Sequence, residues 1–246
     1  MRALATLTAG EVHAWYVRSN AVRPATLERF AAVMSADERA RHDRFRFERD
    51  RHLFLVTRGV IRSLVAGYLG VDPAACVFEI DSRGRPSLAH PAGSGFFFNL
   101  SHTHGLVACA VAPEPEVGVD VEGVERRRSP ELPRQFFSKD EADALEALPE
   151  DAQTARFYDY WTLKEAYIKA RGLGLALPLD GFSMVMDEAG PPRIRFAPSI
   201  DDDPDSWQFA QFTPTPQHRM AIAVRRRDTD WRILFREVMV VEWPDE

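Results

Sequence analysis

The stretch Val117-Gly118-Val119-Asp120-Val121-Glu122 alternates apolar and polar residues with strict period two. In a β-strand this spacing places the three valines on one face, toward a core, and the other three residues on the opposite face. Asp120 and Glu122 then lie about 7 Å apart at their Cα atoms, beside a glycine that allows a ligand to come close. An oxygen-preferring divalent cation would relieve their repulsion. A strand whose acidic residues simply face solvent has the same pattern.

Downstream, the stretch Phe157-Tyr158-Asp159-Tyr160-Trp161-Thr162-Leu163-Lys164-Glu165-Ala166-Tyr167-Ile168-Lys169 predicts a helix from about residue 156 to 170. One helical stripe is apolar except for a lysine: Phe157, Trp161, Lys164 and Ile168. A lysine on the buried side of a helix needs an anion. Glu165 and Lys169 lie one turn apart, which fits either a surface ion pair or a carboxylate that completes a metal site beside a phosphate-binding lysine.

Upstream, Asn99-Leu100-Ser101-His102 lies at a strand end that leads into a turn, where side chains can project into a cleft. A serine hydrolase could use Ser101, His102 and Asp120 as a triad. However, no G-x-S-x-G motif is present, and adjacent strand residues point to opposite faces. His102 and His104 could both bind zinc, but no nearby third ligand has the usual spacing.

Two prolines in Ala112-Pro113-Glu114-Pro115-Glu116 forbid regular structure near the middle of the chain, so we expect a junction between residues 1–114 and 115–246. Ser35 and Glu38 match a capping box that begins a helix, and a second helix covers roughly residues 50–69. A further helix begins near Ser138, and strands are expected at 76–80, 96–100, 106–112, 117–121, 182–186, 207–212, 220–224 and 234–240.

Strands and helices without βαβ alternation predict an α+β fold. The 246 residues are 45% hydrophobic, which is sufficient for a buried core. We expect residues 201–205 and the C-terminal tail to be solvated loops. No run of about 18 apolar residues or signal peptide is present, so a cytoplasmic protein without membrane association is expected. Cys76 and Cys109 are too few and too isolated for a disulfide framework or a Cys-x-x-Cys metal site.

The formal net charge of −6 argues against nucleic-acid binding. The distribution is uneven, because residues 1–114 contain fourteen arginines, no lysine and eleven acidic residues, or +3, which leaves −9 for the rest. A basic half beside an acidic half fits a ligand with phosphates at one end and a metal site at the other. It also fits the composition of an arginine-rich proteome.

Together these segments resemble the Sfp-type phosphopantetheinyl transferases over most of the chain. The family's three signatures occur in order: Gly84-Arg85-Pro86 followed by Phe98-Asn99-Leu100-Ser101-His102, then Val117–Glu122, then Trp161–Lys169. The resemblance implies two similar α+β halves packed as a pseudo-dimer, with coenzyme A in the cleft between them. It further implies a monomer, since both halves of the cleft belong to one chain.

The resemblance also assigns residues to roles. It implies that magnesium is bound by Asp120, Glu122 and Glu165. It implies that Lys164 and Lys169 contact the pyrophosphate of coenzyme A. The phosphates and the 3'-phosphoadenosine end would be held by Arg41, Arg85, Ser101 and His102, with smaller contributions from Arg58 and His52. One departure is Glu38, which stands where a relative has a phosphate-binding lysine and shifts that task toward Arg41 and His102.

The implied reaction transfers 4'-phosphopantetheine from coenzyme A to a serine of an acyl- or peptidyl-carrier protein and releases 3',5'-ADP. The serine proton could pass to Glu165, to Glu141 in Phe136-Phe137-Ser138-Lys139-Asp140-Glu141, or to a metal-bound water. Two other functions are compatible with parts of the pattern: a non-catalytic module that binds coenzyme A or a carrier, and a metal-dependent phosphohydrolase. The sequence does not identify the carrier or its pathway.

Overall fold

The computed structural model describes residues 6–124, 131–174, 177–187 and 190–238. Within these ranges one order of elements occurs twice: a strand, a group of helices that ends in a long one, and two hairpins. The first half contains β1 (Glu11–Arg18), α1 (Pro24–Val33), α2 (Ala36–Asp43), α3 (Glu48–Leu69), β2 (Val77–Ile80), β3 (Pro86–His90), β4 (Phe97–Thr103) and β5 (Leu106–Ala112). The second contains β6 (Val117–Gly123), α4 (Leu132–Phe136), α5 (Lys139–Glu146), α6 (Glu150–Arg171), β7 (Phe182–Val185), β8 (Arg193–Phe196), β9 (Trp207–Phe212) and β10 (His218–Arg225).

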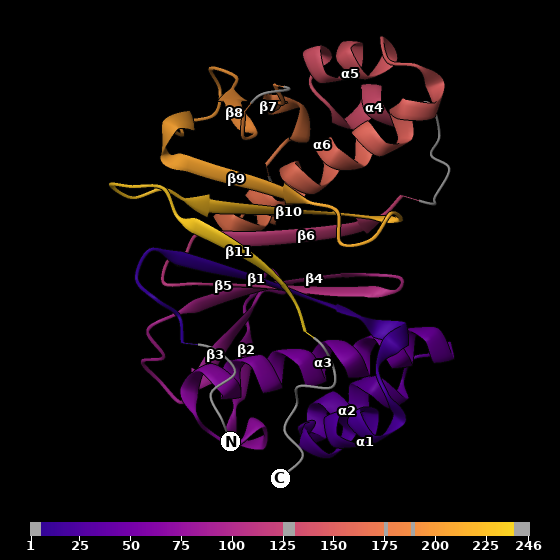
Figure 1. Cartoon of the computed structure of the whole chain (residues 1–246), viewed down its shortest axis with the longest axis vertical. Helices are drawn as coiled ribbons and strands as arrows, with labels where there is room; N and C mark the ends of the chain where they lie inside the picture. Colours follow the sequence, from indigo (N-terminus) through magenta and orange to yellow (C-terminus); the bar gives the residue numbers. More distant parts are fainter. Residues whose placement is uncertain (1–5, 125–130, 175–176, 188–189, 239–246) are drawn as a thin grey trace.

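The main strands form two sheets that lie between two helical layers (Figure 1). The strand order is β11-β1-β5-β4 in the first sheet and β6-β10-β9 in the second. Strand β11 (Arg232–Glu237) follows the second half along the chain but pairs in parallel with β1 of the first sheet. The chain therefore returns to its first half near its C-terminal end. The predicted α+β fold is confirmed.

Three apolar clusters hold the four layers together, one between each helical layer and its sheet and one between the sheets. Strand β5 contributes to two of them. Its even-numbered residues, such as Ala108 and Ala110, face the second sheet, and Val107, Cys109 and Val111 face the side of α3. Because both faces of this strand are covered, its sequence is a continuous apolar run instead of an alternating one.

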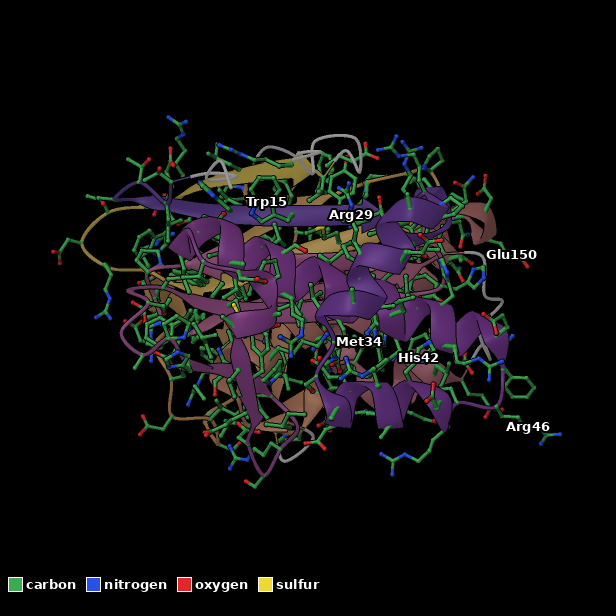
Figure 2. All side chains as sticks on the ribbon, turned by 90° about the horizontal axis from the view of Figure 1, so that it is seen from below. Trp15, Arg29, Met34, His42, Arg46 and Glu150 are labelled. Atoms are coloured by element: carbon green, nitrogen blue, oxygen red, sulfur yellow. The ribbon has the colours of Figure 1, made fainter. Side chains whose placement is uncertain are left out.

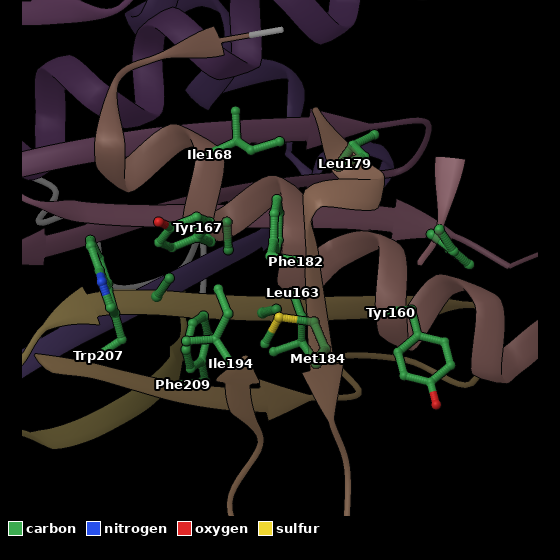
Figure 3. Packing of buried hydrophobic residues seen from close by; sticks show 14 of the residues in the cluster. Tyr160, Leu163, Tyr167, Ile168, Leu179, Phe182, Met184, Ile194, Trp207 and Phe209 are labelled. Carbon is green, nitrogen blue, oxygen red and sulfur yellow. The ribbon is translucent and has the colours of Figure 1, made fainter. Parts of the chain in front are cut away.

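Helix α6 packs against the second sheet and against the β7–β8 hairpin through aromatic side chains. The ring of Tyr167 contacts the rings of Phe182, Phe196 and Trp207 at centroid distances of 5.0, 5.5 and 4.9 Å. Figure 3 shows Tyr167 between Trp207 and Phe182. The predicted helix is confirmed, and it begins earlier than expected, at Glu150. None of the helices in the described residues is long and apolar enough to cross a membrane.

The face of β6 that carries Asp120 is covered by α6, which corrects the expectation that Gly118 allows a ligand to come close. A Cβ atom on Gly118 would lie 2.0 Å from the carbonyl oxygen of Ala166 and 2.6 Å from the nitrogen of Ala170. The absence of a side chain at Gly118 therefore allows the backbone of α6 to pack directly against β6. As a result, Asp120 is only 3% exposed and does not lie on a solvent-facing surface.

Several other elements differ from the sequence expectation. Strands β1, β3 and β8 and helices α1 and α4 were not predicted. Asp202, expected in a solvated loop, has a side chain that is only 4% exposed and accepts hydrogen bonds from Tyr167 Oη (2.7 Å), Trp207 Nε1 (3.0 Å) and Arg225 Nη1 (3.0 Å). Residues 239–240 of the last predicted strand, and the tail after them, lie outside the described residues.

We predict that Gly118→Ala destabilises the protein, because the added methyl group overlaps the backbone of α6 and must push the helix away from β6. The expected loss in free energy of unfolding is about 1–3 kcal/mol or more, measured by urea denaturation. Gly190→Ala is the control, since a Cβ atom there meets no atom within 4 Å. Equal stability of Gly118→Ala and the unmodified protein would contradict the close packing of α6 on β6.

Candidate functional site

A group of three polar side chains joins the two halves at Asp120. Ser101 Oγ in β4 donates a hydrogen bond to Asp120 Oδ1 in β6 (2.8 Å). Lys169 Nζ in α6 donates to the same oxygen (2.6 Å) and to Ser101 Oγ (2.9 Å). The three signature segments of the sequence therefore meet at one carboxylate, which receives a positive charge from Lys169.

Side chains of β4 also bind the backbone of β6. Asn99 Oδ1 accepts a hydrogen bond from Val119 N (3.0 Å), and Ser101 Oγ accepts one from Val121 N (3.3 Å). Both side chains are buried. The expectation that this segment projects into a cleft is therefore wrong for Asn99 and Ser101, whereas His102 is exposed. Ser101 contacts Asp120 without His102 between them, so the arrangement is not a hydrolase triad.

Three carboxylates near this position have features that bear on cation binding. Asp120 Oδ2 is buried and has no hydrogen-bond partner among the described residues. Burial and the nearby charge of Asp120 raise the pKa of Glu165, and Lys169 opposes that change. Glu122 is partly buried and accepts a hydrogen bond from Thr103 Oγ1 (3.4 Å). An unpartnered buried oxygen beside a second acidic group is an arrangement that a divalent cation stabilises.

These carboxylates do not form a ready metal cage. Within the described ranges, no three His, Cys, Asp or Glu side chains converge closely enough to hold a metal ion. That statement also covers His102 and His104, which the sequence left open as zinc ligands. In this structure the ammonium group of Lys169 supplies the positive charge that Asp120 requires.

A cleft of about 1480 Å³ opens beside this group between the two halves. His102, Thr103 and Glu122 are among the residues that line it. Its volume is above that of most small-molecule pockets and is sufficient for a nucleotide-sized ligand. The remaining lining residues come from both halves: Arg18, Ser19, Asn20, Ala21, Glu48, Arg49, Asp50, His52, Leu53, His104, Gly105, Gly123, Thr215, Pro216, Gln217 and His218.

Positive charges gather on the first-half side of the site. The guanidinium groups of Arg41 and Arg58 lie over the same Phe54 ring, 5.5 and 5.2 Å from its centroid. Burial lowers the pKa of Arg58, and its Nε is buried without a hydrogen-bond partner among the described residues. The pKa of His102 is lowered, first by desolvation of the imidazole and then by the positive charges of Lys169, Arg58 and Arg41. Such a cluster favours an anionic ligand.

Glu38 reduces the positive charge of this cluster. Its carboxylate caps α2 by accepting from Ser35 N (2.9 Å), which confirms the predicted capping box. The same carboxylate accepts from Arg62 Nε (2.8 Å) and lies 3.9 Å from Arg58 Nη1. An acidic residue therefore occupies one side of the arginine cluster, which agrees with the departure noted in the sequence.

Arg85 and His52 lie apart from the arginine cluster, and of the two only His52 is among the described residues that line the cleft. Arg85 Nη2 donates to the carbonyl oxygen of Pro115 (2.8 Å), and burial lowers the pKa of its guanidinium. Its Nη1 would lie 3.5 Å from a Cβ atom on Gly172, at the C-terminal end of α6. His52 Nε2 bonds the carbonyl oxygen of Ser19 (2.9 Å). In the part of the chain that the structure describes, no hydrogen bond joins either residue to the arginine cluster.

Lys164 and Glu141 form a buried ion pair away from the cleft, which corrects two expected roles. Lys164 Nζ is fully buried, contacts Glu141 Oε2 (2.7 Å) and donates to the carbonyl oxygens of Leu179 (2.7 Å) and Phe182. All three of its donors are used, so none remains for a phosphate. Glu141 Oε1 accepts from Met184 N (2.7 Å), so its carboxylate is also engaged and is not placed to receive a proton in the cleft.

Sequence reasoning did not assign roles to three residues at this site. Thr103 and Asn99 bind the second half, and both lie in or next to a quoted signature. Arg219 of β10 lies opposite Glu122 of β6 in the strand register. Its Nε donates a hydrogen bond to Asp159 Oδ1 (3.0 Å). Nothing in the local sequence of Arg219 distinguishes it, because its position depends on the strand register.

Comparisons with known proteins identify the family. The model of the 4'-phosphopantetheinyl transferase superfamily matches residues 116–236, and the model of the 4'-phosphopantetheinyl transferase N-terminal region matches residues 21–114. The chain is 36% identical over 221 residues to the 4'-phosphopantetheinyl transferase HetI of a Nostoc species, which covers 89% of this chain and 90% of that protein. The chain belongs to the 4'-phosphopantetheinyl transferase family. It is also 36% identical over 201 residues to a 4'-phosphopantetheinyl transferase of Bacillus subtilis, which covers 82% of this chain and 86% of that protein.

Less than half of the chain is also similar to a solved structure. A holo-(acyl-carrier-protein) synthase from Bacillus anthracis in complex with CoA (3',5'-ADP) matches with a TM-score of 0.38 and 16% identity. The match covers 45% of this chain and 96% of that one.

We predict that Lys164→Met lowers the free energy of unfolding by about 3–5 kcal/mol, because it leaves Glu141 as a buried charge without its partner. The measurement is urea denaturation. The control is Lys139→Met, since Lys139 is exposed and its ion pair with Asp143 contributes about 1 kcal/mol or less. Full stability of Lys164→Met combined with weaker coenzyme A binding would return Lys164 to a phosphate-binding role.

We predict that Glu165→Gln stabilises the metal-free protein at neutral pH. The pKa of Glu165 in the folded state is raised above the usual value of 4.5. The unmodified protein therefore loses stability as pH rises from 4.5 to that raised pKa. The variant avoids this loss, and its advantage should vanish at pH values below 4.5. Thermal unfolding in EDTA from pH 4 to 8 measures the effect, with exposed Glu131→Gln as control. A pH-independent difference would contradict the assignment.

Proposed function

We propose that this protein transfers the 4'-phosphopantetheine group from coenzyme A to a serine of an acyl- or peptidyl-carrier protein and releases 3',5'-ADP. The observation that carries the proposal is the meeting of Asp120, Glu165 and Lys169 beside a nucleotide-sized cleft, in a chain of this family. Acidic groups for a cation and basic groups for phosphates are the two requirements of phosphoryl transfer.

The basic residues provide sites for the phosphates of coenzyme A. Arg41 and Arg58 form the positive cluster, the imidazole of His102 lies close enough to both to feel their charge, and Lys169 contacts Asp120. The unpartnered Arg58 Nε supports an anion at this position. Arg85, at the junction of the halves, would add a contact toward the adenosine end. Ser101 would act by holding Asp120 and Lys169 in place.

A magnesium ion would be held by Asp120, Glu122 and Glu165. The supporting observation is the buried Asp120 Oδ2, which lacks a hydrogen-bond partner in the described ranges. Bound there, the ion would offset negative charge on the pyrophosphate as the leaving group departs. Lys169 would then shift its ammonium group from Asp120 toward a phosphate oxygen, since the bound ion would compensate the charge of Asp120 in its place.

In the transfer step, the carrier serine Oγ forms a bond to the phosphorus nearest the pantetheine. The bond from that phosphorus to the bridging oxygen breaks, and its electrons leave with 3',5'-ADP. Glu165, which lies close to Asp120, would accept the serine proton. Lys169 stabilises the charge that develops on the phosphoryl oxygens.

The two halves, residues 1–114 and 115–246, would form a pseudo-dimer with the reaction at their interface. Their repeated element order supports this division, although β11 returns to the first sheet. We further propose that the protein acts as a cytoplasmic monomer, because one chain supplies both walls of the cleft.

The test is incubation of the purified protein with coenzyme A, Mg²⁺ and an apo carrier protein, followed by mass spectrometry of the carrier. We expect a gain of one phosphopantetheine that disappears in EDTA. We expect Asp120→Ala and Glu165→Ala to abolish the gain, and Arg41→Ala to raise the KM for coenzyme A with a smaller effect on kcat. Near-normal turnover of Asp120→Ala would contradict the metal assignment. Release of phosphate to water without carrier modification would indicate a phosphohydrolase.

A further inference from the structure

An exposed aromatic residue with arginines around it directly precedes a segment that lines the cleft. Phe47 precedes α3 and is 51% exposed, although it is a large apolar side chain. The guanidinium groups of Arg46 and Arg49 each lie 5.4 Å from the centroid of its ring. Figure 2 shows Arg46 extending outward from the edge of the molecule, beyond its helices.

The charge around Phe47 is opposite to that of the whole protein. The segment from Arg39 to Arg51 contains six arginines and three acidic residues, in a chain of net charge −6. Arg44 and Arg46 are exposed and form no ion pair with a described residue. Arg49 has a long contact to Asp50 (3.5 Å). These guanidinium groups therefore remain available to an external anionic surface.

The position of the segment connects it to the site of transfer. Glu48, Arg49 and Asp50, which directly follow Phe47 in the first turn of α3, line the same cleft as His102 and Glu122. A protein that delivers a serine into this cleft must cover its rim. Arginine and aromatic side chains are enriched where protein surfaces bind most tightly.

We propose that Phe47, Arg44 and Arg46 form a docking surface for the carrier protein, and that this surface selects an acidic partner with an apolar side chain near the modified serine. The inference rests on the proposed function. The arginines attract the acidic surface and orient it, and the Phe47 ring packs against the apolar side chain. The surface thereby holds the serine over the cleft without contacting coenzyme A.

The test compares steady-state transfer by Arg44→Glu/Arg46→Glu and by Phe47→Ala with the unmodified protein, using one acidic apo carrier. We expect the double charge reversal to raise the KM for the carrier about tenfold or more, with the KM for coenzyme A unchanged. We expect Phe47→Ala to raise the carrier KM about fivefold. Added NaCl should raise the carrier KM of the unmodified protein more steeply than that of the double variant.

Two control variants match these changes outside the surface. Arg193→Glu reverses an exposed arginine of β8, at the far end of the second half (Figure 1). Ile80→Ala truncates an equally exposed apolar residue of β2. Both should leave the carrier KM unchanged. An unchanged carrier KM in both test variants, or an equal rise in the controls, overturns the proposal.

Direct binding separates this proposal from the proposed function. Fluorescence anisotropy of labelled apo carrier measures binding without transfer. If the unmodified protein binds the carrier but does not modify it, and charge reversal removes the binding, the surface is correct and the proposed function is wrong. If charge reversal removes binding to anionic vesicles but leaves carrier binding intact, the surface belongs to a lipid and the proposal is overturned.

Discussion

A buried carboxylate requires a compensating positive charge, and in this protein that requirement joins the two halves. Asp120 is covered by α6 on the strand that faces the first sheet, so water cannot solvate it. Lys169 from α6 and Ser101 from β4 satisfy one oxygen of the carboxylate. Three elements are thereby fixed relative to one another. Removing one partner of such a group leaves an uncompensated buried charge, which costs several kcal/mol.

One oxygen of the same carboxylate is unsatisfied, which would allow this structural group to serve also as the proposed reaction site. Asp120 Oδ2 has no partner among the described residues, and burial together with the charge of Asp120 raises the pKa of Glu165. Arg41 and Arg58 share the Phe54 ring although their charges repel. Asp120 and Glu165, and likewise Arg41 and Arg58, are thus held at positions where their like charges repel. A ligand that carries phosphates together with a divalent cation relieves both kinds of repulsion at once.

The sequence predicted the elements whose patterns are local. The capping box at Ser35, the helix that carries Lys169 and the strand that carries Asp120 follow from spacing alone. The same patterns did not separate Lys164 from Lys169. Both lie on α6, but Lys164 faces Glu141 and backbone carbonyls in the core, whereas Lys169 faces Asp120. That difference depends on which face of the helix packs on which sheet, and only tertiary structure fixes it. The roles of Gly118, Asp202 and Arg219 escaped prediction for the same reason.

The central claim is that Asp120 holds a divalent cation when coenzyme A is bound. Titration of Mn²⁺ into the protein with coenzyme A, followed by electron paramagnetic resonance of the free ion, tests it directly. The account predicts one Mn²⁺ per chain in the unmodified protein and much weaker binding in folded Asp120→Asn, which retains an acceptor for Ser101 but loses the negative charge. Equal Mn²⁺ binding by the two proteins would contradict the account.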